Sequence, residues 1–152
     1  MTEVVFYTGV VDELSFVTKL SEKILKVKRV ARIATRDTAH SKEVSNYLWS
    51  HQPTKFIPHN VELNTSADDK TALDVSHDTK SSNPDILINL TETPPDHFSS
   101  FNRLVEVVST SKKAIEIARQ RFKWYRDRGY EIKVFKMLYN YYYYYFKLYI
   151  YN

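Results

Sequence analysis

Short apolar runs alternate along the chain with segments whose apolar residues recur every three or four positions. The apolar runs predict strands at residues 3–8, 29–34, 85–90 and 103–108, with further candidates at 55–57 and 130–135. The recurring apolar positions predict helices from Asp12 to about Val27, from Asp37 to near Trp49 and from about Lys112 to Arg128. Strands that alternate with helices indicate an α/β fold with a mostly parallel sheet flanked by helices.

Capping and polar residues mark where the predicted elements end. Asp12 and Asp37 each precede a helical pattern, and aspartate side chains cap the first turn of helices. Gly129 follows the last predicted helix at the position where glycine commonly ends one. The polar stretch from Asn64 to Pro84 predicts a loop or an excursion at the edge of the sheet.

The C-terminal segment differs in composition from the rest of the chain. Residues 138–152 read LYNYYYYYFKLYIYN and contain eight of the twelve tyrosines. They show neither the alternation of a half-buried strand nor the stripe of an amphipathic helix. We therefore expect residues 1–137 to form one α/β domain, and residues 138–152 to be a low-complexity tail outside its core.

Composition excludes several kinds of functional site. The absence of cysteine excludes disulfides and thiolate chemistry and suits a reducing cytoplasm. Two glycines are too few for a phosphate-binding glycine loop. The five histidines lack a zinc-site spacing and no serine lies in a GxSxG motif, so we expect no catalytic residue, metal or cofactor. Without an N-terminal leader or a long apolar run, the sequence predicts a soluble cytoplasmic protein with no membrane partner.

Positive charge is concentrated near the C-terminal end of the predicted domain. Nine basic and three acidic residues lie between Lys112 and Lys136, so this segment has a net charge of +6 while the whole chain has +4. A basic element on a mildly acidic body attracts phosphate backbones or acidic peptides. A well-solvated helix face would have the same composition.

A helical projection of residues 112–128 separates apolar from basic side chains. One stripe is apolar and is predicted to face the domain; it comprises Ala114, Ile115, Ala118, Phe122 and Tyr125. The neighbouring stripe is basic and comprises Lys112, Arg119, Lys123 and Arg126. An apolar floor beside a cationic wall suits a peptide that has acidic residues before a hydrophobic end and a free carboxylate.

Two other interpretations of this helix remain open. The basic stripe also suits single-stranded nucleic acid, whose bases would stack on Phe122, Trp124 or Tyr125. Aromatic residues at this spacing are equally typical of a buried core.

The order of several short motifs resembles a known family. The motifs are FYT at 6–8, LW at 48–49, FIPHN at 56–60, DILINL at 85–90, RLVEVV at 103–108 and ARQRFKWYRDRGY at 118–130. Together, over about residues 3–137, they are similar to the chi subunit family of bacterial DNA polymerase III holoenzyme. The tail beyond Met137 has no counterpart in that pattern.

The resemblance implies a three-layer, Rossmann-like fold without a nucleotide-binding loop, and a non-catalytic role. Chi-type proteins link the clamp loader to single-stranded DNA-binding protein (SSB) by holding the acidic, Phe-terminated C-terminal tail of SSB. Other surfaces bind the psi subunit or a helicase of the XPD/DinG type. Direct contact with DNA is then expected to be weak at most, and direct binding of single-stranded nucleic acid by the basic helix is the alternative function.

The resemblance also implies roles for individual residues. Positions that match the family's tail-binding site are Val108, Arg119, Phe122, Lys123 and Arg126. The family has a lysine where this chain has Ile115, and Lys112 or Lys113 is expected to supply that charge from a neighbouring turn. Phe56 matches an aromatic residue that binds psi or the helicase, although a plain core role also suits it.

Overall fold

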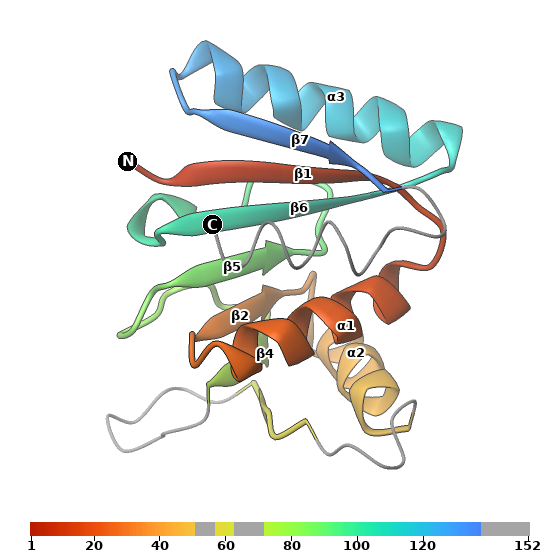
Figure 1. Ribbon diagram of the computed structural model, residues 1–152, viewed down its shortest axis with the longest axis vertical. Helices are drawn as coiled ribbons and strands as arrows, with labels where there is room; N and C mark the ends of the chain where they lie inside the picture. Colours follow the sequence, from red (N-terminus) through yellow and green to blue (C-terminus); the bar gives the residue numbers. More distant parts are fainter. Residues whose placement is uncertain (51–56, 63–71, 138–152) are drawn as a thin grey trace.

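A computed structural model describes residues 1–50, 57–62 and 72–137 of the chain (Figure 1). The helices in these ranges are α1 (Glu13–Lys26), α2 (Thr38–Ser50) and α3 (Lys112–Asp127), with a short 3-10 helix, η1, at Phe98–Ser100. The strands in these ranges are β1 (Glu3–Val10), β2 (Ala31–Ala34), β3 (Asn60–Val61), β4 (Leu73–Ser76), β5 (Ile86–Asn89), β6 (Arg103–Ser109) and β7 (Ile132–Lys136). None of the helices described is long and apolar enough to cross a membrane.

The strands form a single sheet in which every adjacent pair is parallel. From one edge to the other, their order is β3-β4-β2-β5-β6-β1-β7. β1 therefore lies between β6 and the edge strand β7, and Val4 is opposite both Leu104 of β6 and Ile132 of β7. The predicted parallel α/β architecture is confirmed.

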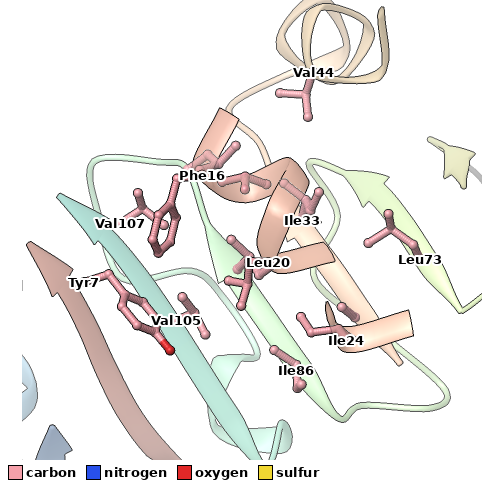
Figure 2. Packing of buried hydrophobic residues seen from close by; sticks show 14 of the residues in the cluster. Tyr7, Phe16, Leu20, Ile24, Ile33, Val44, Leu73, Ile86, Val105 and Val107 are labelled. Carbon is pink, nitrogen blue, oxygen red and sulfur yellow. The ribbon is translucent and has the colours of Figure 1, made fainter. Parts of the chain in front are cut away.

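Helices cover both faces of the sheet, which gives the fold three layers (Figure 1). α1 and α2 pack on one face, where Figure 2 shows Phe16 and Leu20 of α1 against Tyr7 and Val105 of the sheet. α3 and η1 pack on the other face, where Phe6 belongs to the same buried cluster as Tyr125. Successive residues of β1 thus enter different cores, and strands buried on both faces read as continuous apolar runs.

Side-chain caps fix the ends of the helices as the sequence predicts. The Asp12 carboxylate accepts a hydrogen bond from the Ser15 N–H at 3.1 Å, and the Asp37 carboxylate accepts one from the His40 N–H at 2.8 Å. Beyond α3, Gly129 has a φ of +82°, and its N–H donates to the Arg126 carbonyl at 3.0 Å. The predicted N-cap at Asp12, the predicted start of the second helix at Asp37 and the predicted end of the last helix at Gly129 are confirmed.

The loop predicted between Asn64 and Pro84 is wrong over residues 73–76, which form β4 inside the sheet. This strand has only four residues, and its apolar side chains, Leu73 and Val75, are fully buried. The intervening Asp74 is satisfied by the buried Arg32, whose guanidinium lies 3.4 Å from its carboxylate. Two apolar residues within a long polar stretch are too weak a periodic signal to predict a strand.

The candidate strand at 55–57 lies mostly outside the described residues. Its first two residues lie outside the described ranges, and Ile57 is buried without belonging to a strand. The strand β3 begins only at Asn60, beyond Pro58. The candidate at 130–135, in contrast, corresponds to β7 and is confirmed.

Candidate functional site

An open, mostly apolar groove lies between one flank of α3 and the strands β1 and β7. Its volume is about 500 Å³. The apolar residues that line it are Phe6, Val108, Ile115, Ala118, Phe122 and Val134. The other lining residues are Thr8, Gly9, Thr110, Arg119 and Lys136. No acidic residue of the described part of the chain lines this groove.

The helix wall of the groove follows from the periodicity of α3. Ile115, Ala118 and Phe122 lie three and four residues apart, so they share one flank of the helix. The Phe122 ring packs edge-on against Phe6 of β1, with ring centroids 5.6 Å apart. This contact leaves Phe122 partly exposed toward the groove, while Tyr125, one turn further along, is fully buried.

Arg119 is the cation on the helix wall. It is exposed on α3, and no residue in the described ranges forms a hydrogen bond or an ion pair with its guanidinium. An unpaired guanidinium beside an apolar floor is available to a carboxylate from another molecule, which it can bind through two parallel hydrogen bonds.

The predicted site residues fall into two groups. Val108, Arg119 and Phe122 come together in the groove, and Val108 is buried in its floor. Lys112, Lys123 and Arg126 are exposed on α3 and do not line the groove, and an Arg126 guanidinium nitrogen lies 3.4 Å from the neighbouring Asp127 carboxylate. Phe56 and the tail at 138–152 lie outside the described residues.

Neither of the two lysines expected to supply the charge beside Ile115 lines the groove. Lys112 lines no part of the groove, and Lys113 lines a separate crevice on the opposite flank of α3. Sequence reasoning missed Phe6, Val134 and Lys136, since a helical projection of α3 does not reveal which strands lie beside it.

A buried ion pair holds α3 against the sheet. Arg121 is basic but almost fully buried, and its Nε lies 2.5 Å from a carboxylate oxygen of Glu106 in β6. Asn89 and the Tyr125 hydroxyl donate to the other oxygen of Glu106 at 2.7 Å and 3.0 Å. The signal that sequence reasoning missed was Glu106 itself, because a charge inside an apolar strand requires a buried partner.

Burial dominates the electrostatics of this cluster. It raises the pKa of the Glu106 carboxyl, while the Arg121 guanidinium and the donated hydrogen bonds act in the opposite direction. Burial and the adjacent Glu106 charge also raise the pKa of the Tyr125 hydroxyl above its ordinary range. Glu106 and Tyr125 are fully buried between α3 and the sheet, so the cluster positions the helix, while Asn89 and Arg121 also line the crevice at the carboxyl ends of the central strands.

The crevice at the carboxyl ends of the central strands is less suited to an anion. This is where Rossmann-like folds bind nucleotides. Here, Glu13 and Glu92 line it together with Arg36, Lys113 and Arg121, of which Arg121 is already paired with Glu106. The chain also has no glycine loop to cradle a phosphate. Burial raises the pKa of Glu13. Among the described residues, no group of three or more His, Asp or Glu side chains is placed to hold a metal ion.

Comparisons with known proteins identify the family. Residues 1–133 match the family model described as "DNA polymerase III chi subunit, HolC". Proteins named DNA polymerase III subunit chi from Escherichia coli and Pseudomonas aeruginosa are 30% and 29% identical to the chain, over 80% and 79% of its length and 86% and 83% of theirs. The one from Haemophilus influenzae is 27% identical over 82% of the chain and 86% of its own length. The chain therefore belongs to the DNA polymerase III chi subunit family.

Proposed function

We propose that this protein is a non-catalytic adaptor of DNA replication that holds the acidic C-terminal tail of SSB in the groove between α3 and β7. The observation that carries the proposal is the groove itself, which has an apolar floor, an unpaired Arg119 on its wall and no acidic lining residue in the described part of the chain. Through this contact, the adaptor links SSB to the clamp loader of DNA polymerase III or to a helicase.

The terminal Phe of the tail fits the apolar half of the groove. Its ring would lie against Phe122 and Val134, above Val108. Burial of a Phe side chain contributes about 1.5–3 kcal/mol to binding. Association also restricts the motion of both molecules, so a short peptide is expected to bind with at best micromolar affinity, which is a binding free energy of about −8 kcal/mol.

The terminal carboxylate of the tail fits Arg119. A charge-assisted hydrogen bond of this kind contributes about 1.5–3 kcal/mol. Exposed charges are screened over roughly 10 Å at 0.1 M salt, so binding should weaken as salt is added. Lys123, Arg126 and Lys112 are exposed on the same helix and add a positive field that attracts an acidic tail.

The alternative, direct binding of single-stranded nucleic acid, has less support because Tyr125 and Trp124 are engaged, which leaves Phe122 alone of the three candidate stacking residues open toward the groove. Tyr125 is fully buried, and Phe122 packs on Phe6. The Arg128 guanidinium lies 3.7 Å from the centre of the Trp124 ring, and Phe98 packs against the same residue. Base stacking needs an open aromatic face.

The interaction with psi or a helicase is proposed through Phe56, in the FIPHN segment.

The proposal is tested with SSB in solution. Intact SSB and SSB lacking its C-terminal tail are titrated against the full chain and against its Arg119→Met variant. We expect binding only to intact SSB, and a loss of about ten- to a hundredfold in affinity for Arg119→Met. Equal binding of both SSB forms, or tighter binding to bare oligonucleotide than to intact SSB, would reject the proposal.

A further inference from the structure

The α3 groove contains a second cation, on the wall opposite Arg119. Lys136 is the last residue of the edge strand β7 and lines the groove together with Thr8 of β1, to which it is paired in register. Its side chain is exposed, and no residue in the described ranges forms an ion pair or a hydrogen bond with it. Among the residues that the structure describes, the groove therefore has one cation without a partner on each wall.

The other lysines nearby are excluded by their positions or their partners. The Lys133 ammonium lies 3.0 Å from the Glu3 carboxylate. Successive side chains of a strand point to opposite faces, and Val134 and Lys136 of β7 line the groove, so Lys133 points to the other face. Lys113 lines the crevice on the far flank of α3. Lys136 is therefore the lysine that the strands contribute to the described lining of the groove.

The backbone holds Lys136 at this position. The N–H of the next residue, Met137, donates to the Thr8 carbonyl at 2.8 Å. Gly9 has a φ of +71°, and a Cβ at this position would lie 3.0 Å from the Met137 carbonyl oxygen. A larger residue would be strained at this φ and would push the Met137 carbonyl away, so Gly9 allows the close approach that keeps the carboxyl end of β7 against β1 and places Lys136 on the groove.

The two cations suit different carboxylates. The planar guanidinium of Arg119 fits the two oxygens of a terminal carboxylate, whereas the Lys136 ammonium is a compact charge on a flexible stem. Thr8 and Thr110 line the groove near the same end and offer hydroxyl groups that can donate further hydrogen bonds.

We propose that Lys136 forms a second carboxylate subsite in the groove, which binds an acidic side chain upstream of the peptide's terminal residue while Arg119 binds the terminal carboxylate. This assignment rests on the proposed function and adds a direction to it. The acidic part of the peptide runs toward the carboxyl ends of β1 and β7. It does not follow Lys123 and Arg126 toward the C-terminal end of α3.

The test is a double-mutant cycle between the full chain and labelled peptides. The first peptide ends in Phe with a free carboxylate and has several aspartates upstream. The second has asparagines in place of the aspartates, and the third has an amidated terminus. Lys136→Met is compared with Lys42→Met, a matched control that removes the same charge from an exposed lysine of α2, on the other face of the sheet.

We expect Lys136→Met to weaken binding of the first peptide about three- to tenfold beyond the Lys42→Met control. The loss should vanish for the asparagine peptide and persist for the amidated one, and Arg119→Met should show the reverse pattern. A Lys136→Met variant that matches Lys42→Met while Arg119→Met loses affinity overturns this assignment and leaves the proposed function intact. No binding of the first peptide to the unaltered chain overturns both.

Discussion

Val134 is an apolar side chain left in solvent at the edge of the sheet. It is 53% exposed and lines the groove opposite Phe122. Its exposure means that a substitution there removes little buried surface and changes stability little. A substitution at Val134 therefore tests the part that the groove plays in peptide binding without a large change in the stability of the fold.

Replacing Val134 with Asp should weaken binding of an acidic, Phe-terminated peptide about tenfold or more. The new carboxylate would lie in the apolar half of the groove and repel the carboxylates of the peptide. Fluorescence anisotropy measures the affinity, and Val11→Asp is the control, since Val11 is 63% exposed and does not line the groove. Equal losses for both variants would show that the groove is not the binding site.

The residues of the site that sequence reasoning identified are those on α3 and at the end of β6. Arg119 and Phe122 were predictable because helical periodicity places them at the border between the apolar and basic stripes. Lys136 and Val134 were not, because their place in the groove depends on which strand neighbours β1. Parallel strands are joined by long crossovers, so local patterns do not reveal that β7 fills this place.

The junction between β1 and β7 depends on one glycine. Gly9 lies in the left-handed region at the point where the register of β1 shifts against β6, and its missing Cβ leaves room for the Met137 carbonyl. Gly129 has a similar φ, but no atom lies within 4 Å of where its Cβ would be. The two glycines thus offer a comparison of backbone strain with and without crowding.

Replacing Gly9 with Ala should lower the free energy of unfolding more than replacing Gly129 with Ala. Both variants incur the strain of a left-handed alanine, about 1–2 kcal/mol, and only Gly9→Ala must also push the end of β7 away. Urea unfolding measures the difference. We also expect Gly9→Ala alone to weaken peptide binding, because it displaces Lys136. Similar stability and affinity in the two variants would refute this account of the junction.

Elements whose ends carry local signals were predictable, and those defined by distant contacts were not. Asp12 and Asp37 each accept a hydrogen bond from a backbone N–H only three residues further along, so the starts of α1 and α2 depend on local sequence alone. Strand β4 has only Leu73 and Val75 to mark it, and its burial depends on β2 and β3, which are distant in the sequence. Glu106 entered the prediction as part of an apolar run, although its partner, Arg121, lies fifteen residues away on α3.

At the β3 edge of the sheet, an ion pair that depends on pH joins the residues that follow β3 and β4. His77 follows β4, and its Nδ1 lies 2.6 Å from a carboxylate oxygen of Glu62, which follows β3. The hydrogen bond to Glu62 raises the pKa of His77 above its ordinary value. Burial acts to raise the pKa of Glu62, but hydrogen bonds from Ser41 and His77 outweigh it, and that pKa is lowered.

The raised pKa of His77 means that its stabilising effect is complete below the ordinary histidine pKa of about 6.5 and is lost as the pH rises through the folded-state value. Unfolding by urea should therefore show His77→Gln to be less stable than the unaltered chain near about pH 6, with a gap that closes as the pH rises. The lowered pKa of Glu62 acts in a more acidic range and does not confuse the comparison. A gap that stays constant over this range would contradict the ion pair.

The central claim is that the groove between α3 and β7 holds the aromatic end of an acidic peptide. Photo-crosslinking tests it most directly, with a benzophenone-bearing phenylalanine as the last residue of the peptide and mass spectrometry to locate the attachment on the full chain. We predict attachment at Phe122, Val134 or Ile115, abolished by excess unlabelled peptide and reduced in Arg119→Met. Attachment on the far flank of α3, near Trp124, or on α2 would contradict the account.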